Sequence, residues 1–112
     1  MRVCIDIDGT ICETDSSKEY AEVSPIRGAR VALIALKQEG HHIILFTARH
    51  MKTCKGDADL AENKQRGTLE WWLGYHEIPY DELIFGKPYA DIYIDDKGYK
   101  FEDWGDTLRD NF

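Results

Sequence analysis

Two aspartates two residues apart stand where the first apolar run of the chain ends. Residues 3–7 alternate apolar with polar side chains and run into an Asp-Gly-Thr turn signal, which is typical of a buried strand that stops at a turn. In an extended chain the side chains of Asp6 and Asp8 point the same way. Two carboxylates on one face repel unless a cation lies between them or one is protonated. The pair therefore predicts a cation site or a shared proton.

Three later apolar runs also end at polar side chains. Thr47 follows the second run, Lys87 the third, and Asp95 with Asp96 the fourth. Three or four acids with no His or Cys nearby suit a hard, oxygen-preferring ion, with Mg²⁺ the first candidate. The lysine adds a fixed positive charge and the threonine a hydroxyl donor. Together these groups predict a phosphate site, in which metal and ammonium neutralise the phosphate oxygens.

The two aspartates suit two different chemical roles in such a site. A carboxylate is ionised at pH 7 and attacks phosphorus without a base. The alkoxide that leaves needs a proton, and a neighbouring carboxyl is its natural donor and later the base that activates water. We therefore predict Asp6 as the nucleophile and Asp8 as the general acid and base.

The elements that must position these groups follow from the hydrophobic periodicity. Strands are predicted at residues 3–7, 42–46, 82–85 and 90–94. One helix is predicted to begin at Ser24-Pro25, with Ser24 as its cap, and to stop at Gly40. A second spans residues 60–75 and follows a polar loop at 50–60, and Phe101 and Trp104 are expected to pack. This alternation predicts a doubly wound α/β sheet, whose strand ends meet at one edge.

Length and charge narrow the class of protein. The chain has 112 residues, and its 21 acidic against 14 basic side chains give a net charge of −7. That length predicts one domain, residues 1–112. The acidic balance argues against nucleic acid as the main partner. The longest uncharged run, residues 40–48, is too short for a membrane-spanning helix, so no membrane partner is expected. Three cysteines without paired spacing predict a reduced, cytoplasmic chain.

At this point the motifs resemble those of a known family. The segment Asp6-Ile7-Asp8-Gly9-Thr10 resembles the first motif, DxDGT, of the haloacid dehalogenase (HAD) superfamily. The apolar run ending at Thr47 resembles its second motif, Lys87 its third, and Ile94-Asp95-Asp96 its acidic fourth. Order and spacing agree from residue 3 to residue 96. More loosely, the segments FTAR, GKP and ADIYIDD are similar to small HAD proteins labelled capsule or polysaccharide biosynthesis phosphatases.

The resemblance implies a three-layer, Rossmann-like α/β fold, in which helices flank a parallel sheet, and an aspartyl-phosphate intermediate. It implies that Asp6 is nucleophile and metal ligand, and that Asp8 is the acid and base and also lends a carbonyl to Mg²⁺. Thr47 and Lys87 would hold the phosphoryl group, and Asp95 and Asp96 would ligate the metal. The residues expected to bind substrate are Gly9, Thr10, Ala48 and Arg49. For Arg49 a surface salt bridge stays an open alternative.

The spacing between motifs leaves no room for a cap domain. Residues 11–46 hold one loop, one helix and one strand, and residues 48–86 hold one loop and one helix. This resembles the capless HAD group, whose members act on bulky substrates or borrow a neighbouring subunit as a lid. The resemblance therefore implies a homo-oligomer, and residues 50–60 are a candidate small lid.

The function that these observations predict is an enzyme: a Mg²⁺-dependent phosphomonoester hydrolase acting on a small sugar or polyol phosphate, with surface-polysaccharide synthesis as its setting. Two alternatives stay open. The first is a non-enzymatic module similar to a response-regulator receiver domain, although receivers carry the phosphorylated aspartate after a middle strand. The second is a phosphatase of nucleic-acid ends, which the net charge disfavours.

Overall fold

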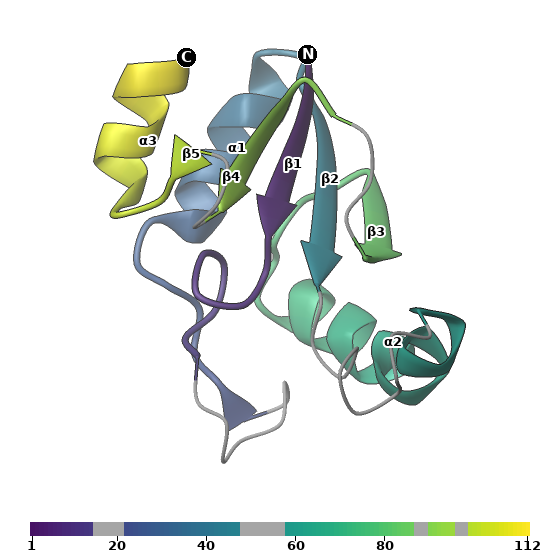
Figure 1. Cartoon of the computed structure of the whole chain (residues 1–112). Helices are drawn as coiled ribbons and strands as arrows, with labels where there is room; N and C mark the ends of the chain where they lie inside the picture. The colour runs from purple at the N-terminus through teal and green to yellow at the C-terminus, as the bar shows by residue number, and fades with distance from the viewer. Residues whose placement is uncertain (15–21, 48–57, 87–89, 96–98) are drawn as a thin grey trace.

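A five-stranded parallel sheet organises the chain (Figure 1). The computed structural model describes residues 1–14, 22–47, 58–86, 90–95 and 99–112, with the backbone alone for 58–65, 95 and 99. The strands are β1 (Arg2–Asp6), β2 (His42–Thr47), β3 (Glu82–Phe85), β4 (Ile92–Asp95) and β5 (Tyr99–Lys100), in the order β3-β2-β1-β4-β5. The helices are α1 (Ala29–Gln38), α2 (Ala58–Tyr75) and α3 (Trp104–Asn111). This arrangement confirms the predicted class, an α/β fold built on a parallel sheet.

The two faces of the sheet carry different apolar clusters. Alternate strand residues such as Val3, Ile5 and Leu45 form the main core, to which all three helices contribute. The residues between them form a smaller cluster: Cys4, Ile44, Phe46, Ile84, Ala90 and Tyr93. Right-handed crossovers from β1 to β2 and from β2 to β3 step in one direction, which puts α1 and α2 on the same face. In the described part of the chain, the opposite face is therefore lined by this smaller cluster rather than by helices.

The predicted helix start at Ser24-Pro25 is wrong, because α1 begins at Ala29. The backbone around Pro25 pairs instead with the loop after β1. The Glu13 N–H donates to the Ser24 carbonyl at 2.9 Å, and Pro25 forms an isolated bridge with Cys12. Gly28 then adopts a left-handed φ of 88° directly before the helix, so the helix cannot extend back through it.

The other predicted elements agree with the structure to within two residues. The third strand matches at both ends, and the second helix begins two residues earlier than predicted, at Ala58. Of the predicted loop at 50–60, residues 50–57 lie outside the described chain. The short strand β5 and helix α3 were not predicted. Phe101 and Trp104 pack in the main core, as predicted.

No additional domain interrupts the sheet in the described residues of the intervals 7–41 and 48–81, which hold loops with α1 and α2. This agrees with the predicted absence of a cap. Among the described helices, none combines the length and the hydrophobicity that crossing a membrane requires.

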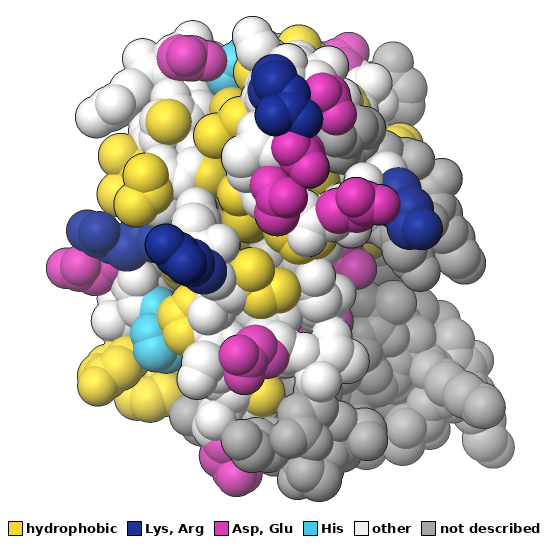
Figure 2. Space-filling model, turned by 90° about the vertical axis from the view of Figure 1, so that its left-hand side faces the viewer, with side chains coloured by type: hydrophobic (Ala, Val, Ile, Leu, Met, Phe, Trp, Pro, Cys, Tyr) yellow, Lys and Arg dark blue, Asp and Glu magenta, His cyan; other side chains and the backbone are white. Residues whose placement is uncertain are grey.

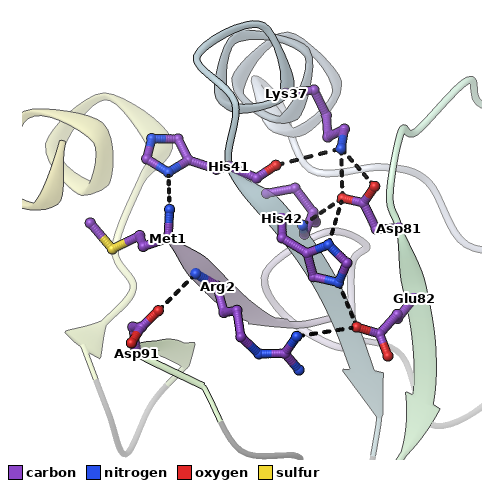
Figure 3. A network of polar contacts seen from close by, with 9 residues as sticks. Met1, Arg2, Lys37, His41, His42, Asp81, Glu82 and Asp91 are labelled. Carbon is purple, nitrogen blue, oxygen red and sulfur yellow. Dashed lines mark hydrogen bonds and ion pairs between the residues drawn. The ribbon is translucent and has the colours of Figure 1, made fainter.

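A network of charged side chains ties the amino ends of the strands to α1 (Figure 3). The Lys37 ammonium contacts both carboxylate oxygens of Asp81, at 2.7 and 2.6 Å, and the Ile43 N–H donates to the same carboxylate at 2.7 Å. His42 contacts Glu82 beside it. Because Asp6 lies at the other end of β1, this network stabilises the fold and takes no part in the candidate site.

Replacing Lys37 tests the stability that this network contributes. Hydrogen bonding from Lys37 holds the pKa of Asp81 below its usual value. A lowered folded-state pKa stabilises the protein above the unfolded pKa, about 3.9, and the stabilisation is lost as the pH falls through the folded value. Lys37→Met should lower the free energy of unfolding by roughly 0.5–1 kcal/mol near neutral pH. In urea titrations the difference from wild type should shrink below about pH 4; a difference independent of pH would contradict this.

Candidate active site

The site is built on the tight loop that follows β1. Asp6 is the last residue of that strand, and the Ile7 carbonyl accepts the backbone N–H groups of residues 10–12 at 2.9–3.3 Å. Gly9 has a φ of 84°, and a Cβ there would lie 3.1 Å from the Thr14 hydroxyl oxygen. The backbone of the loop therefore requires glycine at position 9, where the chain turns sharply after the strand end.

A cavity of about 260 Å³ opens at this loop. The described residues that line it are Asp6, Asp8, Gly9, Thr10, Thr14 and Phe101. Both aspartates are half-buried. Asp6 and Asp8 therefore line one cavity together, and their roles in it stay predictions.

The neighbouring strand brings Thr47 to the same place. Asp6 pairs with Phe46 in the parallel register, so Thr47 lies one residue beyond the end of β1. Thr47 is fully buried, and its hydroxyl donates to the Asp8 carboxylate at 2.6 Å. This contact joins two motifs that are 39 residues apart in the sequence.

The ends of β3 and β4 also lie at this edge of the sheet. The Gly86 N–H donates to the Thr47 carbonyl at 3.0 Å, so β3 ends beside Thr47 and Lys87 is the next residue. Ile5 pairs with Ile94 across β1 and β4, which puts Asp95 next to Asp6 in the register. Only the backbone of Asp95 is described. Four predicted site residues lie outside the described chain: Ala48, Arg49, Lys87 and Asp96.

The polar side-chain atoms that line the cavity are all oxygens, from two carboxylates and two hydroxyls. Such a donor set fits a hard cation such as Mg²⁺ and disfavours zinc, which prefers His and Cys. No three His, Cys, Asp or Glu side chains come together as a metal site within the described residues. The predicted site needs Asp95 and Asp96 in addition, so it stays a prediction.

Two residues of the cavity wall, Thr14 and Phe101, have no motif that would mark them in the sequence. Phe101 follows β5, a strand of two residues that hydrophobic periodicity does not reveal. Its neighbour Trp104 is buried, and the Trp104 indole N–H donates to the Thr10 carbonyl at 3.1 Å. The C-terminal segment therefore holds the loop that carries Asp8.

Removing this hydrogen bond should loosen the loop. Trp104→Phe should lower the free energy of unfolding by about 1–3 kcal/mol, from the unpaired carbonyl and the smaller ring. Trp71→Phe is the matched control, because Trp71 is 54% exposed on α2 and its change should stay within about 0.5 kcal/mol. Urea unfolding measures both variants. Equal losses would mean that the Trp104 contact contributes nothing specific.

Comparisons with solved structures agree with this geometry. A structural-genomics target from Vibrio cholerae is 33% identical, with a TM-score of 0.71 over 85% of this chain and 79% of that one. A chain of the Pnkp1/Rnl/Hen1 RNA repair complex is 24% identical (TM-score 0.57), over 77% of this chain and 25% of that one. A D,D-heptose 1,7-bisphosphate phosphatase from B. bronchiseptica, complexed with magnesium and phosphate, is 16% identical (TM-score 0.53), over 80% and 51%.

No protein-family model and no curated sequence matches the chain. The fold that it shares with these structures is HAD-like, and its DxDGT motif lies at the end of the first strand. The comparisons therefore support the HAD-like fold that the resemblance implies.

Proposed function

We propose that the protein is a Mg²⁺-dependent phosphomonoester hydrolase that acts through an aspartyl-phosphate on a small sugar or polyol phosphate. The observation that carries this proposal is the pair of carboxylates, Asp6 and Asp8, in one cavity, with the Thr47 hydroxyl bonded to Asp8. The looser resemblance to capsule and polysaccharide biosynthesis phosphatases supports surface-polysaccharide synthesis as its setting. The proposal also includes a single domain over residues 1–112, a cytoplasmic location and a homo-oligomer.

In the first step, a carboxylate oxygen of Asp6 forms a bond to phosphorus while the bond from phosphorus to the ester oxygen breaks. The protonated carboxyl of Asp8 gives its proton to the departing oxygen. In the second step, water attacks the same phosphorus and Asp8 takes a proton from it. Phosphate then leaves, Asp6 is again a carboxylate, and Asp8 again holds its proton.

Thr47 has a positioning role in this scheme. Its hydroxyl donates to one oxygen of Asp8 and so orients that carboxyl for proton transfer. We propose that Lys87 and Arg49 neutralise the phosphate oxygens, and that Thr47, the neighbouring Ala48 backbone and the Gly9-Thr10 turn orient them. Mg²⁺, held by Asp6, the Asp8 carbonyl, Asp95 and Asp96, would supply positive charge against the phosphate.

The surface supports a small substrate over a polymer. On the face in Figure 2, Asp and Glu side chains lie beside most of the described Lys and Arg side chains. The Arg109 guanidinium pairs with Asp106 and Asp110. Binding of a nucleic-acid backbone depends on clustered, unpaired basic groups. The net charge of −7 also disfavours binding of a nucleic-acid backbone.

Phosphate release from a panel of sugar and polyol phosphates, with and without Mg²⁺, tests the proposal. We expect hydrolysis of at least one ester, lost when the metal is chelated. The proposal is wrong if neither the panel nor an aryl phosphate is hydrolysed and if, in addition, phosphate added together with fluoride does not bind to the protein.

A second candidate is hydrolysis of phosphate at a nucleic-acid end, which the similarity to a chain of an RNA repair complex favours. Competition by 5′- or 3′-phosphorylated oligonucleotides against a sugar phosphate separates the two. We expect weak competition. The receiver-like alternative would instead require a phosphorylated Asp6 that persists for minutes or longer.

A further inference from the structure

Phe101 gives the cavity an aromatic wall. The other described lining residues are two aspartates, two threonines and a glycine, so the ring is the one large apolar side chain among them. Phe101 is half-buried: it packs against the main core and also lines the cavity. A half-open ring beside two carboxylates provides a surface for the part of a ligand that carries no charge.

The Phe101 ring is held in place before any ligand arrives. It meets the Trp104 ring edge-on, with centroids 5.3 Å apart and planes at 60°. Trp104 itself is 3% exposed and anchored to the Thr10 carbonyl. Because a buried neighbour fixes the orientation of the Phe101 ring, little conformational entropy of this side chain is lost when a ligand contacts it.

Phe101 and the two aspartates line the same cavity. An ester whose phosphorus lies at Asp6 therefore has Phe101 within reach of its alcohol part. A sugar ring offers a flat face of C–H groups to an aromatic ring and hydroxyls at its rim. An open-chain polyol has no such face and loses more rotamer freedom on binding.

We infer that Phe101 is a specificity-determining residue, which selects phosphate esters of ring-form sugars over those of open-chain polyols. This inference rests on the proposed function and narrows its substrate class. Phe101 acts on the alcohol part of the ester, whereas Asp6 and Asp8 act on the phosphoryl group. A change at Phe101 should therefore alter the preference between two esters that carry the same phosphate.

Glucose 6-phosphate and sorbitol 6-phosphate are the probes, because they share carbon number and phosphate position and differ in the ring. Phe101→Ala should lower the ratio of their kcat/KM values, ring over open chain, by roughly three- to tenfold, mainly through KM. Phe101→Leu, which keeps apolar bulk without a flat face, should lower the ratio too. Phe101→Tyr, which keeps the flat aromatic ring, should leave the ratio near its wild-type value. Trp71→Phe, on the exposed side of α2, is the control.

An unchanged ratio in both Phe101→Ala and Phe101→Leu, whatever the total loss of activity, would overturn the inference, since that pattern indicates a structural role alone. If the alanine variant does not fold, the leucine variant decides. If the wild type hydrolyses neither ester, the panel of esters and the aryl phosphate decide the proposed function separately. Calorimetry then compares the Kd of both esters: a loss confined to the ring ester supports the inference, and equal losses or no binding overturn it.

Discussion

Asp6→Asn is expected to abolish phosphate release, with kcat lower by about four orders of magnitude or more. The amide that replaces the carboxylate is neutral and a poor nucleophile, so no bond to phosphorus forms. The loss should be the same for every ester that the wild type hydrolyses, because the attacking atom is common to all of them. Phosphate release under saturating substrate measures it.

The fold should survive this substitution. Asp6 is half-buried at the strand end, its backbone pairs with Phe46, and asparagine has nearly the same shape. Asp103→Asn is the matched control, because Asp103 caps α3 outside the cavity and asparagine caps a helix equally well. If Asp6→Asn retains more than about one per cent of wild-type activity, Asp6 is not the nucleophile.

Asp8→Asn is expected to have the second-largest effect, and one that depends on the leaving group. An alkoxide must be protonated as it leaves, so hydrolysis of a sugar phosphate should fall by about 10²- to 10⁴-fold. A nitrophenolate leaves without a proton, so the first step on nitrophenyl phosphate should be affected much less. The second step still lacks its base, and the aspartyl-phosphate should therefore accumulate.

A rapid-mixing experiment with nitrophenyl phosphate shows this directly. Asp8→Asn should release about one equivalent of nitrophenol per active site in a burst, followed by slow turnover. The Thr47 hydroxyl can still bond to the amide oxygen at position 8, so the geometry should persist. Equal losses for alkyl and aryl esters, with no burst, would contradict the role of Asp8 as acid and base.

The sheet could be predicted from the sequence because its central strands, β1 and β2, are buried on both faces. A continuous apolar run such as residues 42–46 is enough to predict a buried strand. Parallel pairing of the strands then brings their carboxyl ends to the same edge of the sheet. The arrival of Asp6, Asp8 and Thr47 at one edge follows from that pairing. Their roles in catalysis came from chemistry and from the family resemblance, and they stay predictions.

The wrong and missed predictions of secondary structure have physical causes that the structure shows. Ser24-Pro25 has the composition of a helix start, yet the backbone there hydrogen-bonds to the loop after β1, which is a tertiary contact that no local signal reports. Strand β5 is two residues long, too short for any periodicity. Phe101 reaches the cavity from the end of that strand, so its place in the wall depends on three-dimensional packing alone.

The most direct test of the central claim is to locate the phosphorylated side chain during turnover. Borohydride reduces an aspartyl-phosphate to homoserine, which peptide mass spectrometry locates in the sequence. In wild-type protein quenched during hydrolysis of a sugar phosphate, we expect homoserine at position 6. Homoserine at position 8 or 95 instead, or none at any position while phosphate is released, would contradict the account.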